Sequence, residues 1–288
     1  MPAQDKPTTP AGRIWLITGA SSGFGRTLAD AALAAGDTVV AAVRRPDALA
    51  EYAAAHPGRL VPVALDVSDT AAAATVVAEA VERFGRIDVL VNNAGRGLVG
   101  AVEETSDAEL RDLMDLHFFG PAALIRAVLP HMRAQKSGAV VQMSSMGGRL
   151  SFPGVGAYSA TKFALEGLTE ALAGEVAPYG ITCLIVEPGA FRTGFAGAGA
   201  LQSTATTLPA YEDTVGAVRT GLPESDGSQP GDPVKAAAAI LAALDAEQPP
   251  LRLALGNDAV DAIRAHAEAS SAELDAWEAV ARATTFEA

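Results

Sequence analysis

Short apolar runs alternate with Ala-rich helical stretches between residues 13 and 186 of this 288-residue chain, and few folds accommodate that rhythm. Several runs are apolar on both faces, as strands buried inside a parallel sheet are. The alternation predicts an α/β protein with a doubly wound, Rossmann-type parallel sheet flanked by helices on both faces. The predicted strands are residues 13–18, 38–43, 60–65, 89–91, 139–143, 182–186 and 251–255. The predicted helices are residues 26–35, 70–84, 107–132, 159–177, 233–244 and 258–283.

The pattern changes at residues 194–231, which are rich in Gly, Ser, Thr and Pro and have no sustained period. Such a long segment inside a compact domain is usually a mobile lid or substrate loop, and less often disordered. Its place directly after a predicted strand favours a substrate-binding lid. The polar, Pro-rich residues 1–11 predict a flexible tail. With no internal repeat and no second core, residues 12–288 are predicted to form a single domain that ends in the helices of residues 233–288.

Composition excludes several classes of function. The net charge of −13 disfavours a nucleic-acid partner or an anionic membrane surface. A single cysteine, Cys183, excludes an internal disulfide framework and a Cys-based zinc site, and its apolar neighbours predict a buried, inert thiol. We find neither a signal-peptide core nor a run of about 18 apolar residues that would span a membrane. We therefore expect a cytoplasmic protein with no metal site, no membrane and no nucleic acid.

The sequence TGASSGFG at residues 18–25 follows a predicted strand and opens a predicted helix. Its glycines permit a tight turn, so that backbone N–H groups can approach a pyrophosphate at the helix N-terminus. A Gly-rich turn alone is often only a loop, but this context is the one that a dinucleotide site requires. The expected cofactor contacts are Gly19, Ser21, Ser22, Gly23, Phe24 and Gly25.

The end of the second predicted strand distinguishes between the two nicotinamide dinucleotides. An acidic residue there would hydrogen-bond the adenosine 2′-hydroxyl of NAD, but the position is Val43. Arg44 and Arg45 follow, and a guanidinium at this place pairs with a 2′-phosphate. We assign that role first to Arg44, because Arg45 can equally be a solvated surface residue. The sequence therefore predicts NADP(H) in preference to NAD(H).

Two further turns lie where the same cofactor would bind. Asp66 and Val67 can present a carboxylate and an amide to the adenine edge. Asp66 can alternatively cap the next helix, although Ser68 or Asp69 can do so in its place. The NNAG turn at residues 92–95 closes the fourth strand near the expected ribose, unless it is ordinary turn chemistry. Its expected cofactor contacts are Asn93, Ala94 and Gly95.

Tyr158 and Lys162 are four residues apart on a predicted helix, so their side chains share one face. A phenol with a pKa of about 10 is a poor acid–base catalyst near neutrality. A neighbouring ammonium and an oxidised nicotinamide favour the phenolate and bring that pKa toward the working range. Ser145 stands thirteen residues before Tyr158 and can hydrogen-bond a substrate oxygen. In the alternative, Tyr158 is an aromatic residue at a helix start, Lys162 a solvated side chain and Ser145 a cap at a strand end. Ser144 is the neighbouring candidate for the catalytic serine.

Five motifs together resemble the short-chain dehydrogenase/reductase family over roughly residues 12–195, and more loosely beyond. They are TGASSGFG, Asp66-Val67, NNAG, Ser145 with Tyr158-x-x-x-Lys162, and PGAFRT at residues 188–193. The resemblance implies that Tyr158 protonates a carbonyl oxygen as hydride arrives from the nicotinamide. It also implies that Ser145 binds the same oxygen and that Lys162 binds the nicotinamide ribose. The implied contacts beneath and beside the nicotinamide are Pro188, Gly189, Phe191 and Thr193.

One position departs from that family's pattern. His117-Phe118-Phe119-Gly120 stands where the family's long helix usually has N-x-x-G, whose Asn bends the helix and fixes a water that links the lysine to solvent. A histidine also donates and accepts hydrogen bonds, and it can titrate near pH 6.5. We therefore expect His117 to support catalysis, with a satisfied core histidine as the alternative.

The predicted cleft lining is apolar, with Leu150, Phe152 and Phe195 as substrate contacts beside Ser145. Arg149 and Arg192 are the cations nearest to it, and both can be surface residues. This favours a neutral, fairly hydrophobic ketone or aldehyde, or the matching alcohol, as substrate. The alternatives are a non-catalytic NADP(H)-binding redox sensor and an epimerase or dehydratase that holds its nucleotide tightly. Because similar enzymes pair their small-residue helices across a two-fold axis, a homodimer or homotetramer is expected.

Overall fold

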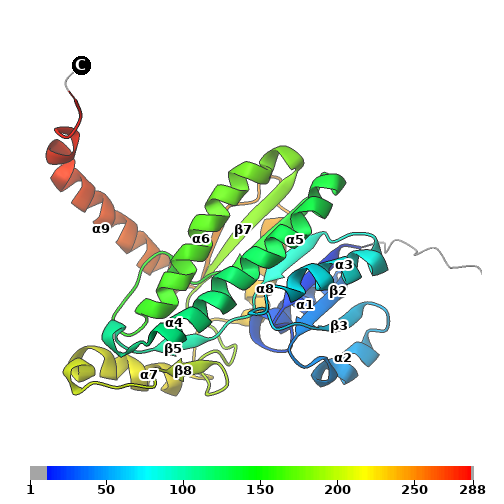
Figure 1. Cartoon of the computed structure of the whole chain (residues 1–288), viewed down its shortest axis with the longest axis horizontal. Coiled ribbons are helices and arrows are strands. Elements are labelled where there is room, and N and C mark those ends of the chain that lie inside the picture. Colours follow the sequence, from blue (N-terminus) through cyan, green and yellow to red (C-terminus); the bar gives the residue numbers. More distant parts are fainter. Residues whose placement is uncertain (1–11, 287–288) are drawn as a thin grey trace, which may run out of the picture.

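A seven-stranded parallel sheet in the order β3-β2-β1-β4-β6-β7-β9 forms the centre of the protein, in a computed structural model that describes residues 12–286 (Figure 1). The predicted doubly wound fold is therefore confirmed, and the predicted tail, residues 1–11, lies outside the described residues. All seven predicted strands are present. They are β1 (Ile14–Thr18), β2 (Thr38–Val43), β3 (Leu60–Ala64), β4 (Val89–Asn92), β6 (Gly138–Met143), β7 (Ile181–Pro188) and β9 (Arg252–Leu255).

Helices cover both faces of this sheet because its strands are apolar on both sides. In β1, Trp15 and Ile17 pack into the core with α1 (Gly23–Ala34) and α8 (Pro233–Leu244). Ile14 and Leu16 point to the opposite core, as the period of two in a strand requires. The helices of that second face are α3 (Ala72–Phe84), α5 (Gly120–Gln135) and α6 (Gly156–Val176), and a short α2 (Ala50–Ala55) leads into β3. Cys183 is buried there, as predicted, and burial raises the pKa of its thiol to about 12.

The predicted helix at residues 107–132 is present but is not regular throughout. It begins as α4 (Asp107–Met114), widens into a π-helical turn at Asp115–Phe119, and continues as α5. By length and hydropathy, residues 107–135 are apolar enough to cross a membrane, but half of the apolar window is buried within the domain. Core helices pass the same test, and α5 packs against α3 in the second core.

The segment that follows β7 has more regular structure than its composition indicates. It contains β8 (Leu201–Ser203), a π-helical turn at Glu212–Gly216 and α7 (Ala217–Glu224). Strand β8 pairs with β5 (Gly97–Val99) in a separate two-stranded parallel sheet. The elements are too short, and their partners too distant in sequence, for a periodic pattern to reveal them. That the segment moves as a lid stays a prediction.

Helix α9 (Asn257–Arg282) projects from the body of the molecule (Figure 1). Of its residues only Ala259 is buried, and the side chains of Leu274 and Trp277 are each 66% exposed. The predicted helix at residues 258–283 is therefore correct in extent, but most of it adds nothing to the core. Its first turns contact β9 and the turn that follows β6.

Candidate active site

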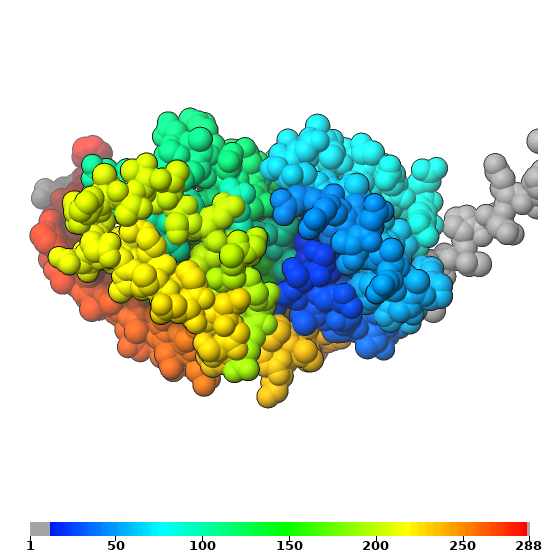
Figure 2. All heavy atoms as spheres, turned by 90° about the horizontal axis from the view of Figure 1, so that it is seen from below, coloured from blue at the N-terminus to red at the C-terminus, as the bar shows by residue number. Residues whose placement is uncertain are grey.

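A cleft of about 800 Å³ opens at the carboxyl ends of the parallel strands. The loops that follow β1, β2, β3, β4, β6 and β7 line it, and residues of the segment after 194 form its other wall. Figure 2 shows the N-terminal elements (blue) and the segment near residues 200–230 (yellow) on either side of a hollow. Ligands of open parallel sheets bind at this edge.

The Gly-rich turn has the geometry that a phosphate-binding turn needs. Gly19 and Gly23 have positive φ angles of 66° and 52°, which other residues rarely adopt. Ser22 is the extended residue before α1 and its side chain makes no cap hydrogen bond, so the first N–H groups of the helix remain available. Of the predicted contacts, Gly19, Ser21, Ser22, Gly23 and Phe24 line the cleft. Gly25 lies beneath the turn instead, where a Cβ would strike the carbonyl oxygen of Gly19.

The NNAG turn is tied to the Gly-rich turn by its second asparagine. Asn93 Nδ2 donates to the carbonyl oxygen of Thr18 at 2.8 Å, and Thr18 Oγ1 accepts from the backbone N–H groups of Asn93 and Ala94. The amide of Asn93 therefore holds two strand ends together. Ala94 and Gly95, together with Asn93, line the cleft, so this turn can still contact a ribose.

Arg44, Asp66 and Val67 line the adenosine end of the cleft, whereas Arg45 is exposed and outside it. Asp66 does not cap α3, because it accepts from the N–H and the hydroxyl of Ser68 at 3.0 and 2.6 Å. These hydrogen bonds are the main reason why the pKa of the Asp66 carboxyl is lowered, and the charges of Arg44 and Arg96 lower it further.

Ser145, Tyr158 and Lys162 meet at the centre of the cleft. Ser145 follows β6 and its Oγ accepts from the N–H of Gly147 at 3.0 Å, so its hydroxyl hydrogen can donate to Tyr158 or to a ligand. Lys162 Nζ donates to the carbonyl oxygen of Met143 at 2.8 Å and lies 5.7 Å from the centre of the Tyr158 ring. The predicted convergence of the three side chains is therefore present.

The electrostatics of this cluster differ from expectation. Burial raises the pKa of Tyr158 to about 12, and the hydrogen bond with Ser145 lowers it only in part. Burial also lowers the pKa of Lys162 to about 8, against the opposing charge of Glu166. In the protein without a nucleotide, desolvation of the phenolate outweighs any acidification by Lys162. Tyr158 is thus a neutral phenol at neutral pH.

His117 lies in the π-helical turn and both its ring nitrogens are engaged. Nε2 accepts from the N–H of Arg96 at 3.1 Å, so Nδ1 carries the proton and donates to Thr161 Oγ1 at 2.9 Å. Thr161 in turn donates to the carbonyl oxygen of Tyr158 at 2.7 Å. No ring nitrogen is left to hold a relay water, and His117 does not line the cleft. The expected titration near pH 6.5 is wrong, because burial holds the pKa of His117 well below that value.

The remaining predicted contacts divide into two groups. Those that line the cleft are Pro188, Gly189, Phe191, Thr193, Phe152 and Phe195. Leu150 does not line it. Neither do the two arginines near the cleft: Arg149 pairs with Glu187 at 3.1 Å, and Arg192 Nε donates to the carbonyl oxygen of Gln229 at 2.6 Å.

Several residues that line the cleft could not be identified from any feature of the sequence. Leu222 and Gln229 reach the cleft from the segment after β8, and Val155 from the turn before α6. Only the tertiary structure brings these to the site. Arg96 is different, because it directly follows the NNAG turn and its position alone was a reason to consider it.

The sequence profile of the family described as short chain dehydrogenase matches residues 13–202. The chain belongs to this family. An oxidoreductase of Botryotinia fuckeliana, BOA17, is 41% identical over 266 residues, which is 92% of this chain and 96% of that protein. A 3-ketodihydrosphingosine reductase of Bacteroides thetaiotaomicron is 40% identical over 64% of this chain and 65% of its own length.

Solved structures agree with this assignment. A short-chain dehydrogenase from Streptomyces avermitilis is 57% identical, with a TM-score of 0.91 over 96% of this chain and 100% of that one. A short-chain dehydrogenase/reductase from Burkholderia phymatum, solved in complex with NAD, is 26% identical with a TM-score of 0.78 over 89% and 93% of the two chains. The protein is thus a short-chain dehydrogenase-type oxidoreductase that has the fold of a nicotinamide-dependent enzyme.

Proposed function

We propose that this protein is an NADP(H)-dependent oxidoreductase that interconverts a neutral, fairly hydrophobic ketone or aldehyde and its alcohol. The observation that carries the proposal is the meeting of Ser145, Tyr158 and Lys162 in the same cleft as the Gly-rich turn. The alternative functions have no observation of their own in favour of them. A redox sensor that had lost catalysis would not need to keep a Tyr–Lys pair at this place.

The three side chains have separate roles in the proposed reaction. Ser145 donates its hydroxyl hydrogen to the carbonyl oxygen and holds it near Tyr158. Tyr158 is neutral at pH 7, so it is ready to give its proton to that oxygen during reduction. Lys162, fixed by Met143, keeps positive charge beside the phenolate that results. Thr193 would help to hold a nicotinamide, which would supply or accept the hydride.

The preference for NADP(H) is supported by local charge. Arg44 lines the adenosine end of the cleft, and no carboxylate stands at Val43 to repel a 2′-phosphate. The Burkholderia phymatum neighbour binds NAD, but at 26% identity it does not decide this chain's cofactor. Wild-type protein is expected to bind NADPH more tightly than NADH, and Arg44→Ala is expected to reduce the difference.

The substrate class is supported by the wall opposite the nucleotide turn. Phe152, Val155, Phe195 and Leu222 make this wall apolar, and Arg149 and Arg192 are both engaged by protein groups. A carboxylate or phosphate on the substrate would therefore have no cationic partner there. One relative is named for its action on a ketone, 3-ketodihydrosphingosine, which agrees with this class.

The test is a panel of hydrophobic ketones with NADPH and NADH, followed by the absorbance of the reduced nicotinamide. Tyr158→Phe removes one oxygen and is expected to lower kcat/KM by about 1,000-fold while nucleotide binding persists. Val155→Ala changes the apolar wall. It is expected to alter KM for the substrate while the protein still catalyses the same class of reaction. Turnover that survives Tyr158→Phe on every substrate would end the proposal.

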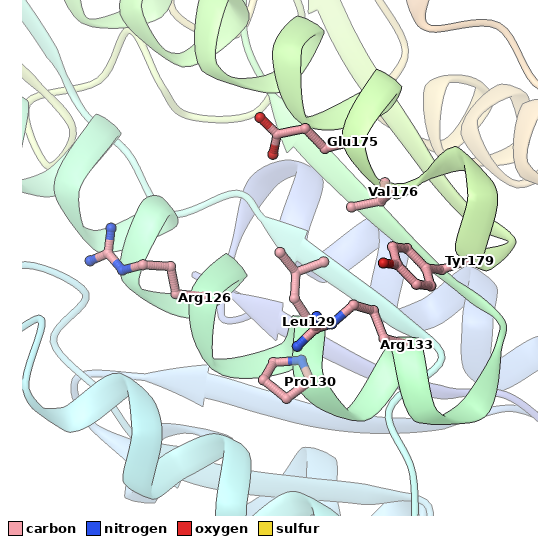
Figure 3. A pocket seen from close by; sticks show the side chains of 7 residues that line it. All are labelled: Arg126, Leu129, Pro130, Arg133, Glu175, Val176 and Tyr179. Atoms are coloured by element: carbon pink, nitrogen blue, oxygen red, sulfur yellow. The ribbon is translucent and has the colours of Figure 1, made fainter.

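We further propose a cytoplasmic homodimer or homotetramer. Phe119, Phe163 and Tyr179 on the outer sides of the helices from residue 115 onward are each more than 40% exposed, which supports contact with a second copy. A shallow hollow of about 290 Å³ lies between α5 and α6 on this side (Figure 3). Arg133 points into it from α5, and Tyr179 from the 3-10 turn at Ala177–Tyr179 that follows α6. Sedimentation equilibrium measures the assembly, and a strictly monomeric protein would contradict it.

A further inference from the structure

Arg96 is a cation in the cleft without an ion-pair partner among the residues that the structure describes. It directly follows the NNAG turn, and its backbone N–H is fixed by His117 Nε2. Its side chain is half-buried and lines the cleft, yet Nε is buried without a hydrogen-bond partner. Within residues 12–286 its guanidinium forms no ion pair. Buried polar groups of this kind are rare, and each needs an explanation.

Other arginines of comparable burial are neutralised by protein groups. Arg219 pairs with the buried Glu104 at 2.6 Å, and Arg252 pairs with Glu166 at 3.2 Å. The fold thus supplies carboxylates where a guanidinium has a structural task. Arg96 has no such partner but faces a cavity large enough for a nucleotide, so its task lies with a ligand.

The side chain belongs to the adenosine end of the cleft. Arg44 and Arg96 both act on the charge of Asp66, at the end of β3, from two different loops. Within residues 12–286 Asp66 forms an ion pair with neither, and its Oδ1 atom accepts from Ser68. Two guanidinium groups that form no ion pair within the described residues therefore lie close enough to Asp66 to lower its pKa. Asp112 and Asp115 also line the cleft, but within residues 12–286 neither forms an ion pair with Arg96.

We propose that Arg96 is a second ligand for a phosphate monoester on the adenosine ribose and acts with Arg44 to select NADP(H). This deepens the proposed function and rests on it. A guanidinium provides a planar fork of donors that matches phosphate oxygens, so two of them can bind a dianion from two sides. A nucleotide with a 2′-hydroxyl leaves the second guanidinium without its anion.

The experiment measures nucleotide binding by calorimetry, independently of turnover, with NADPH, NADH and the fragments 2′,5′-ADP and 5′-AMP. Arg96→Ala is expected to weaken NADPH and 2′,5′-ADP by about 10- to 100-fold, the range for a charge-assisted hydrogen bond. NADH and 5′-AMP are expected to change by less than threefold. Arg96→Lys keeps the charge without the fork and is expected to fall between wild type and Arg96→Ala. Arg45→Ala is the matched control, since Arg45 is exposed and outside the cleft, and is expected to bind like wild type.

Three results would overturn the inference. An equal loss of affinity for NADPH and NADH in Arg96→Ala would show one of two things. Arg96 would either offset the negative charges of Asp112 and Asp115 or contact a part common to both nucleotides. Unchanged binding would show that it contacts neither. Loss of selectivity in Arg44→Ala but not in Arg96→Ala would refute only the role of Arg96 and leave the proposed function intact. Far-UV circular dichroism and thermal unfolding confirm that each variant is folded.

Discussion

Gly120 at the start of α5 packs directly on the carbonyl oxygen of Val67, so closely that no Cβ fits between them. Val67 lines the adenosine end of the cleft, and Gly120 directly follows the π-helical turn that carries His117. This contact fixes the distance between the cofactor side of the site and the helix behind the catalytic side chains. It explains a glycine in a helix, where glycine ordinarily costs about 1 kcal/mol relative to alanine.

Gly120→Ala is expected to lower the free energy of unfolding by about 2 kcal/mol or more, because the helix must shift away from Val67. Gly167→Ala in α6 is the matched control. No atom lies within 4 Å of the Cβ that it would add, so it is expected to stabilise the protein by up to about 1 kcal/mol. Urea unfolding of both variants measures the two effects. Variants of equal stability would show that the contact is not tight.

Lys162→Met is expected to stabilise the protein at pH 7 by about 1–3 kcal/mol while it abolishes activity. Burial lowers the pKa of Lys162 from 10.5 to about 8, so between these values the unfolded chain binds more protons than the folded protein. Wild-type stability therefore rises with pH across that window, and the advantage of the variant shrinks. Thermal unfolding of wild type and variant at pH 7 and pH 10 measures the difference in stability between them. Lys235→Met, at an exposed lysine, is the control, and its stability difference from wild type should not change with pH. A pH-independent stability difference for Lys162→Met would contradict the lowered pKa of Lys162.

His117→Asn is expected to keep or raise turnover, and the pH profile of kcat/KM should have no His117 inflection near pH 6.5. The reason is that burial keeps the imidazole neutral well below that pH, with both nitrogens hydrogen-bonded. Profiles of wild type and variant between pH 5.5 and 7.5 make the comparison. An inflection that only the wild type shows, or a loss of more than about tenfold, would give His117 a specific part in catalysis.

Ser144→Ala and Ser145→Ala separate the two neighbouring serines. Ser144 Oγ donates to the buried Glu166 at 2.7 Å, so its loss is expected to lower stability by about 1–3 kcal/mol with kcat nearly unchanged. Ser145 has no such partner and is expected to lose about 100-fold in kcat/KM with little effect on stability. Kinetics and thermal unfolding of both variants decide the matter. The reverse pattern would assign the substrate oxygen to Ser144.

The sheet could be predicted from sequence because several of its strands are apolar on both faces and most alternate with a helix. The convergence of Tyr158 and Lys162 followed from their spacing on a helix. The π-helical turn at Asp115–Phe119 could not be predicted, since its apolar residues also fit a regular helix. The pKa of Tyr158 was expected to move toward neutrality because spacing reveals a neighbouring charge but not the extent of burial. Arg96 was missed because its lack of a partner is a property of the folded protein.

The pairing of β5 with β8 joins the two walls of the cleft. Strand β5 begins two residues after the NNAG turn, and Gly97 to Val99 lie in register with Leu201 to Ser203. A displacement of the outer wall would therefore pull on the backbone that holds the nucleotide, and a bound nucleotide would restrain that wall in return. We therefore expect binding of the coenzyme and the position of the outer wall to be coupled, which favours an ordered sequence with the coenzyme first.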